Sequence, residues 1–160
     1  MKKYFSLLLL LISINGYSQQ TDNPDKKNVL EKVNNFFEAL EKKDTVLYKS
    51  LAFPNGQIWV SRIQQDSVKT QMRYISDDIT HLPVMKEVIE EKPLKIEINL
   101  HGNIAVVWVP YTLSLSGKFS HCGIDVFTLL KTYEGWKIVS CVYSVEPNGC
   151  DGIKKEYHLN

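Results

Sequence analysis

The sequence predicts an α+β domain in which N-terminal helices pack on one face of an antiparallel sheet. In the first half, most apolar residues recur at the three- and four-residue spacing of amphipathic helices. From Leu94 onward they alternate with polar residues, as strands require. Turn signals at His101-Gly102-Asn103, Gly117 and Glu134-Gly135 divide this second half. Helices followed by hairpin-connected strands are typical of an α+β domain.

The first residues predict a signal peptide. Lys2 and Lys3 precede an apolar run from Tyr4 to Ile14, and Gly16-Tyr17-Ser18 supplies the small residues that a signal peptidase reads. We expect residues 1–18 to be removed after Ser18. The run is too short to span a bilayer, and no cysteine follows it for lipid attachment. We therefore expect an exported protein, periplasmic or secreted, without a stable membrane anchor.

The remaining length and charge limit the classes of function. About 142 residues suffice for one domain with a single core. We expect a polar lead-in over residues 19–25, the domain over 26–150 and a C-terminal tail over 151–160. Loss of Lys2 and Lys3 lowers the number of basic residues from 19 to 17, against 18 acidic residues. This balance gives no electrostatic reason to expect a nucleic-acid partner.

Helical spacing first extends over roughly Asp25 to Lys43, with Pro24 suited to a first helical position behind Asn23. Asp44 then fits the N-cap of a shorter helix, which the turn residues Pro54-Asn55-Gly56 end. Next, residues 57–63 alternate like a short strand. Asp66 or Ser67 is expected to cap a third helix with the apolar residues Val68, Met72 and Ile75.

The second half predicts a four-stranded antiparallel meander. Residues 94–100 and 104–116 give the first two strands, and the Gly117 and Glu134-Gly135 hairpins lead to the other two. Pro110 lacks a backbone donor, so a bulge or a locally unpaired edge is expected there.

This order of elements resembles the nuclear transport factor 2-like superfamily. The segments Trp108–Tyr111, Gly117–Asp125 and Gly135–Ile138 are similar to exported bacterial members without established activity, described as SnoaL-like or lumazine-binding-like. The resemblance covers roughly Asn28 to Cys150. It implies a cone-shaped, cystatin-like fold with a pocket between a curved sheet and the first helices, and an outer sheet face that pairs with a partner.

Strand register decides which residues face such a pocket. If the Gly117 hairpin pairs symmetrically, Tyr111 lies opposite Gly123. The pocket face then carries Val109, Tyr111, His121, Asp125 and Phe127. A one-residue change in the turn, or a bulge at Pro110, would put Trp108 in place of Tyr111. We keep both as ligand-binding candidates, together with Phe127 and with Trp59 at the rim.

His121 and Asp125 are the candidate catalytic pair. Four strand residues separate them, so they share a face at about 13 Å from each other. In an apolar pocket, a His can act as general base near neutral pH and an Asp with a raised pKa can donate a proton. In the alternative, purely structural interpretation, each side chain satisfies a backbone group.

We expect no metal site and no cofactor. The four histidines are scattered, no HExxH or CxxC motif occurs, and the glycines form neither a phosphate loop nor a dinucleotide fingerprint. Cys122 follows His121 directly, but adjacent strand residues point to opposite faces, so the imidazole cannot readily activate this thiol.

An exported chain favours disulfides. Across the Glu134-Gly135 hairpin, Cys122 falls near Pro147, so Cys150 can fold back onto it. We predict a Cys122–Cys150 disulfide and a buried free thiol at Cys141; the alternative is that all three are reduced.

Three classes of function remain from these observations. The protein can be a small-ligand-binding domain for an apolar or aromatic molecule, because the fold encloses a pocket and the sequence supplies aromatic residues. It can be a dehydratase-like lyase or isomerase that uses His121 and Asp125. It can also be a homodimerisation or protein-interaction domain that uses the outer sheet face.

Overall fold

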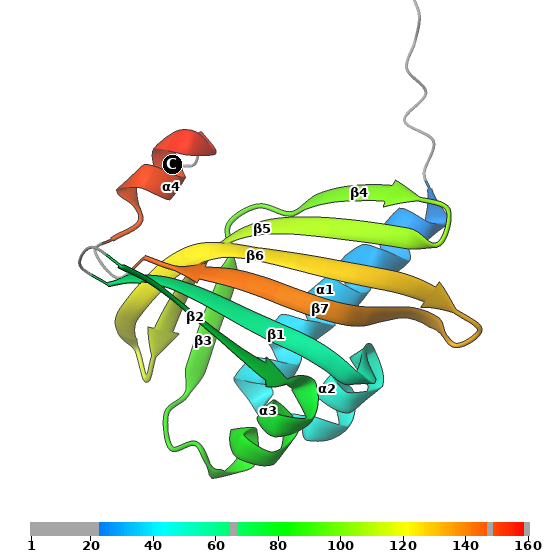
Figure 1. The fold of residues 1–160 in the computed structure, drawn as a ribbon, viewed down its shortest axis with the longest axis horizontal. Coiled ribbons are helices and arrows are strands. Elements are labelled where there is room, and N and C mark those ends of the chain that lie inside the picture. Colours follow the sequence, from blue (N-terminus) through cyan, green and yellow to red (C-terminus); the bar gives the residue numbers. More distant parts are fainter. Residues whose placement is uncertain (1–22, 65–66, 147–148, 159–160) are drawn as a thin grey trace, which may run out of the picture.

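Helices cover one face of a single curved sheet in the computed structural model, which describes residues 23–64, 67–146 and 149–158 (Figure 1). In chain order the elements are α1 (Pro24–Lys42), α2 (Thr45–Leu51), β1 (Ala52–Gln64), β2 (Ser67–Tyr74), α3 (Ile75–His81), the 3₁₀ helix η1 (Leu82–Val84), β3 (Ile89–Pro93), β4 (Glu97–His101), β5 (Ile104–Leu115), β6 (Lys118–Thr132), β7 (Gly135–Val145) and α4 (Asp151–Glu156). The predicted signal peptide, residues 1–18, lies outside the described residues. Within the described ranges, no helix is both long enough and apolar enough to cross a membrane.

The first two helices begin where the sequence predicts. The Asn23 side chain accepts a hydrogen bond from the backbone N–H of Asp25 (3.0 Å), ahead of Pro24. The Asp44 carboxylate accepts from the N–H groups of Val46 and Leu47, at 3.0 and 2.9 Å. Each cap satisfies donors that the first helical turn leaves unpaired.

The predicted meander is confirmed. Strands β4 to β7 pair in sequence through antiparallel ladders. The full sheet has seven strands in the order β2-β1-β7-β6-β5-β3, with β4 also pairing with β5. The sheet is mixed, and not wholly antiparallel as predicted, because β1 runs parallel to β7.

The third predicted helix is wrong over most of its length. Residues 67–74 form β2, an edge strand that pairs antiparallel with β1, and the helix α3 begins only at Ile75. Val68 and Met72 are exposed, at 64% and 39%, so their helical spacing does not mark a buried face. Pro54-Asn55-Gly56 does not form the predicted turn after the second helix either. These residues belong to β1, at an irregularity in its pairing with β7.

Pro110 stays in register with Ile124, so the predicted bulge is wrong at this position. The irregularity of that ladder falls between Leu113 and Ser114. On its other side, β5 changes partner from β4 to β3 around Pro110. The predicted unpaired edge is therefore confirmed, since no regular ladder requires the missing N–H there.

The core lies between the sheet and the helices. Three phenylalanines form its centre: the ring of Phe127 on β6 lies 5.0 Å from that of Phe36 and 5.9 Å from that of Phe37, centroid to centroid, both edge to face. All three are buried. Such contacts attach α1 to the sheet and fix one wall of the space between the helices and the sheet.

The predicted disulfide is confirmed. Cys122 and Cys150 are bonded, with Cα atoms 5.8 Å apart, and Cys141 is a buried free thiol. The bond ties the start of α4 to β6. α4 falls within the segment predicted as a C-terminal tail, and it buries Ile153.

Candidate functional site

A cavity of about 170 Å³ lies between the helices and the face of the sheet that they cover. Apolar side chains of α1, β1, η1 and β3 form much of its wall. Its titratable side chains come from four strands and two helices: Tyr48, Arg73, Asp78, His81, Glu91, His121, Asp125, Cys141 and Tyr143.

Register places these groups on one face. Glu91 pairs with Leu113, and Leu113 pairs with His121, so the three side chains form one cross-strand row from β3 to β6. Asp125 pairs with Tyr143 two rows further along. Residues directly opposite each other have Cβ atoms about 5 Å apart. Side chains distant in the sequence are thus brought to one cavity.

Asp125 is the most deeply buried of the carboxyls. It is 3% exposed, and its Oδ1 lies 4.0 Å from the Cys141 sulfur, which donates weakly to it. Its Oδ2 has no hydrogen-bond partner among the described residues. Burial, and then the negative charge of Glu91, raise the pKa of Asp125 well above its ordinary value.

Glu91 is half-buried, and its carboxyl has no hydrogen bond or ion pair with any other described residue. Burial raises the pKa of Glu91 from 4.5 to about 7, and the positive charge of Arg73 opposes this rise. Because Glu91 also contributes to the raised pKa of Asp125, the two carboxyls titrate as a pair.

His121 offers an unused ring nitrogen. Its Nδ1 lies 2.9 Å from the hydroxyl oxygen of Ser120, whereas its Nε2 is buried without a partner in the described part of the chain. Burial, and then the charge of Arg62, lower the pKa of His121. The imidazole is therefore neutral near pH 7. Its ring packs edge to face on the Tyr111 ring, at 5.8 Å between centroids.

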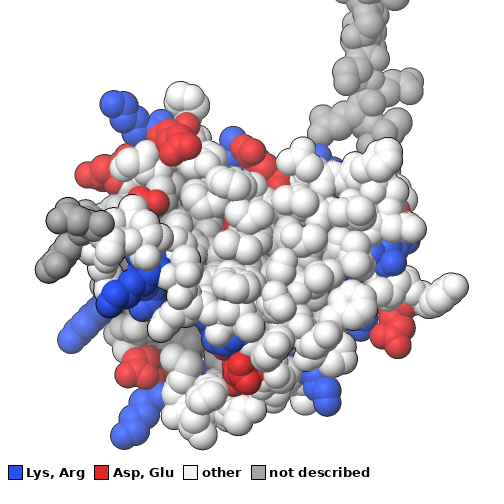
Figure 2. Space-filling model, viewed as in Figure 1, with Lys and Arg blue, Asp and Glu red and all other residues white. Residues whose placement is uncertain are grey.

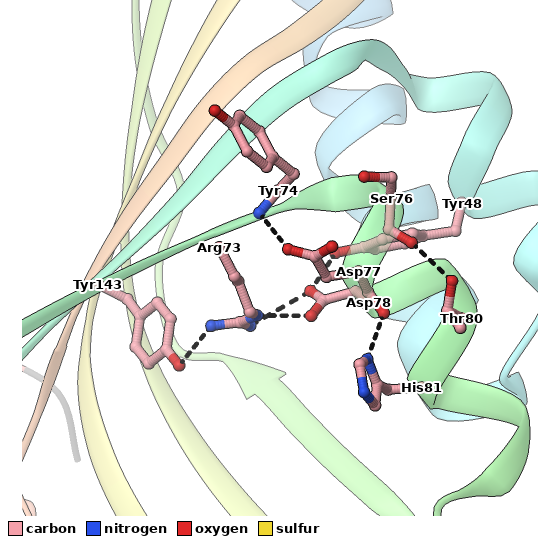
Figure 3. Close-up of polar contacts among 9 residues, drawn as sticks. All are labelled: Tyr48, Arg73, Tyr74, Ser76, Asp77, Asp78, Thr80, His81 and Tyr143. Carbon is pink, nitrogen blue, oxygen red and sulfur yellow. Dashed lines mark hydrogen bonds and ion pairs between the residues drawn. The ribbon is translucent and has the colours of Figure 1, made fainter.

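Arg73 is held by a polar network (Figure 3). Its Nε and Nη2 both donate to the Asp78 carboxylate, at 2.5 and 3.2 Å, and its Nη1 donates to the Tyr143 hydroxyl at 3.3 Å. The Tyr48 hydroxyl also donates to Asp78 (3.0 Å). Burial and the adjacent Asp78 raise the pKa of Tyr48, so this hydroxyl stays protonated.

The structure separates the predicted site residues. His121 and Asp125 line the cavity. Tyr111 pairs with Gly123, as the symmetric hairpin predicts, but its hydroxyl donates to the Ser144 carbonyl (2.8 Å) and does not line the cavity. Phe127 belongs to the core behind it.

Trp108 and Trp59 face the other way. They are 37% and 40% exposed, and neither lines the cavity. The register that would have put Trp108 on the His121 face is excluded, because Trp108 pairs with Val126. Their positions give no support to the ligand-binding role expected for these two tryptophans.

Sequence reasoning missed Glu91, Arg73, Asp78 and Tyr143. Arg73 lies in the segment predicted as a helix, and Glu91 lies in a segment for which no element was predicted. A signal for Tyr143 existed, since it lies two residues from the predicted buried Cys141 and therefore shares its strand face. Among the described residues, no group of three His, Cys, Asp or Glu side chains is arranged to hold a metal ion.

No family model matches the sequence, and no curated protein matches it. Solved structures do. A nuclear transport factor 2-like protein from Cytophaga hutchinsonii has a TM-score of 0.65 at 11% identity, over 76% of this chain and 98% of its own. A protein of unknown function with a cystatin-like fold from Nostoc punctiforme has a TM-score of 0.61 at 13% identity, over 78% of this chain and 93% of its own.

A third similar structure comes from Streptomyces avermitilis. It is a member of the nuclear transport factor 2-like family for which dehydratase activity has been suggested. Its TM-score is 0.57 at 18% identity, over 78% of this chain and 99% of its own. At these identities the likeness establishes the fold. The chain has the cystatin-like, nuclear transport factor 2-like fold that the sequence resemblance implies.

Proposed function

We propose that this protein binds a small, largely apolar molecule in the cavity between its helices and sheet. One observation carries the proposal: Asp125 Oδ2 and His121 Nε2 are both buried, both lack partners among the described residues, and both belong to residues that line this cavity. A buried polar atom without a partner is costly. A ligand with hydrogen-bonding groups at matching positions would satisfy both atoms.

The cavity limits the size of that ligand. An apolar cavity of about 150 Å³ accepts a benzene molecule, and the cavity of this protein is of similar volume, about 170 Å³. A single ring with one or two polar substituents fits this space. Phe36, Leu40 and Ile58 supply apolar contacts for such a ring.

Native mass spectrometry of protein purified from its natural source, with thermal-shift screening of small metabolites, tests this proposal. A retained or stabilising molecule should be lost in Leu113→Trp, which fills the cavity. Val106→Trp is the matched control, because Val106 lies on the same strand but is 36% exposed. If no molecule is retained and none of the metabolites raises the melting temperature, the proposal fails.

A second candidate function is a dehydratase-like lyase or isomerase. It is favoured by the opposite pKa shifts of two groups in one cavity: a neutral His121 can accept a proton and a protonated Asp125 can donate one. Turnover of a hydroxylated substrate that is lost in both His121→Gln and Asp125→Asn would support it. Turnover that survives both substitutions would refute it.

The outer face of the sheet supports a homodimer. Trp59, Val142 and Trp108 are 40%, 43% and 37% exposed, and cross-strand pairing joins them through Val126 into one row. Figure 2 shows that charged side chains lie mostly around the edge of this face. Sedimentation should show a dimer that Val142→Glu dissociates. A wild-type monomer at high concentration would refute this interface.

We also infer that the protein is exported, because disulfides such as Cys122–Cys150 persist in oxidising compartments. Cell fractionation with an antibody tests this, and recovery of the unprocessed chain in the cytosol would refute it.

A further inference from the structure

The cavity contains more acidic than basic groups. Among the described residues, its carboxyls are Asp78, Glu91 and Asp125, and its permanent cation is Arg73. The Arg73 guanidinium is committed to Asp78 by two hydrogen bonds. A bidentate pair of this kind is strong and neutralises both partners. Glu91 and Asp125 are therefore left without a cation of their own.

Other groups around the two carboxyls do not supply this cation. The facing groups are Tyr48 on α2, Asp78 and His81 on α3, Arg73 on β2, Tyr111 on β5, His121 on β6, and Cys141 and Tyr143 on β7. Burial lowers the pKa of His121 and raises that of Cys141, so both are neutral near pH 7. His81 is exposed, and its Nδ1 lies 2.6 Å from the Asp77 carbonyl.

We propose that the ligand of this cavity is a small organic cation, a protonated primary amine on an apolar body of about one ring, held between Glu91 and Asp125. This inference rests on the proposed function and names the class of its ligand. An ammonium group has three donors. It would donate a hydrogen bond to Asp125 Oδ2. Asp125 is only 3% exposed, and this oxygen has no partner in the described part of the chain.

The cavity wall suits the rest of such a molecule. Phe36, Tyr48 and Tyr143 place aromatic rings along it, and ring faces attract an organic cation. An anion would meet the two uncommitted carboxyls instead, and the guanidinium that would attract it is already paired. A neutral isostere would leave the carboxyls sharing protons without a counter-charge. The order of preference is therefore cation, neutral molecule, anion.

Binding of a cation is linked to protons. The cation favours the ionised form of both carboxyls, so its binding releases protons that the empty cavity holds. Affinity for an amine should therefore rise with pH from about 5.5 to about 8, whereas affinity for a neutral isostere should change little.

Isothermal titration calorimetry with benzylamine, benzyl alcohol and benzoate tests the proposal. We expect benzylamine to bind roughly ten- to a hundredfold more tightly than benzyl alcohol at about pH 8, the range that hydrogen bonds between charged groups give. Benzoate should bind weakest. Titrations in two buffers of different ionisation enthalpy should show proton release for benzylamine alone.

The variants Glu91→Gln and Asp125→Asn should each lose most of the preference for benzylamine while still binding benzyl alcohol. Glu90→Gln is the control, because Glu90 neighbours Glu91 on β3 but does not line the cavity. Equal binding of benzylamine and benzyl alcohol, stronger binding of benzoate, or a preference unchanged in both variants would overturn the cation proposal and leave the binding proposal standing. Failure of all three probes to bind would count against both.

Discussion

Replacing Glu91 by glutamine should change how the stability of this protein depends on pH. Glu91 is half-buried, and burial raises the pKa of its carboxyl from 4.5 to about 7. Between these two values the native protein holds a proton that the unfolded chain has lost. The free energy of unfolding therefore falls as the pH rises through this window. Glutamine is nearly isosteric with the protonated acid and does not titrate.

The size of the effect follows from the shift. Each pKa unit corresponds to about 1.4 kcal/mol, so a shift from 4.5 to about 7 gives about 3 kcal/mol between pH 4.5 and pH 8. Glu91→Gln should match the wild type near pH 4.5 and be more stable by about 3 kcal/mol near pH 8. Relief of the repulsion on Asp125 acts in the same direction.

Urea denaturation followed by the fluorescence of the buried Trp136 measures this difference. His121 has a lowered pKa, so its contribution has the opposite sign: stability rises as the pH approaches its ordinary value of 6.5. Comparing variant with wild type at each pH removes that contribution, and Glu90→Gln controls for the change in net charge. A stability difference that stays constant from pH 4.5 to pH 8 would refute the reasoning.

Three further changes test the packing around the site. Phe127→Ala removes a fully buried ring from the core and should cost about 3 to 5 kcal/mol in urea denaturation; a cost below about 1 kcal/mol would contradict this packing. Gly123→Ala would make a Cβ collide with the backbone carbonyl oxygen of Ser144, so it should lower the melting temperature sharply, and an unchanged value would contradict the close approach. Cys150→Ser removes a bond with a sequence separation of 28 and should cost about 3 to 4 kcal/mol. Hydrogen exchange should then be faster in α4, and unchanged protection there would show that the bond does not hold this helix.

The middle of the sheet could be predicted from the sequence because its strands alternate in polarity and its turns contain glycine. The sequence left the faces of Tyr111 and Trp108 open, because a change of one residue at the Gly117 turn reverses them. In the structure Leu115 pairs with Lys118, and the irregularity between Leu113 and Ser114 then restores the symmetric pairing of Tyr111 with Gly123. The next hairpin was predicted less well, because Thr132 pairs with Gly135, so the turn residues are Tyr133 and Glu134 and not Glu134 and Gly135. Cys122 therefore lies opposite Glu146 and not opposite Pro147, as the sequence predicted.

The edge strands could not be predicted in this way. β2 is exposed along nearly its whole length, so it has no buried face for an alternating pattern to show. Val68, Met72 and Ile75 happened to fit helical spacing, and pairing with β1 decided otherwise. Tertiary context often overrides such a local pattern.

These edges also determine the charge of the site. His121 and Asp125 lie on the central strand β6, where alternation reveals them, and by themselves they suggest a pocket for an apolar or aromatic molecule. Arg73 and Glu91 lie on β2 and β3, the two ends of the strand order. Glu91 joins His121 only through the cross-strand row that includes Leu113. This row brings a second carboxyl to the cavity. On the other edge of the sheet, Arg73 is committed to Asp78. The expected ligand therefore changes from an uncharged molecule to a cation.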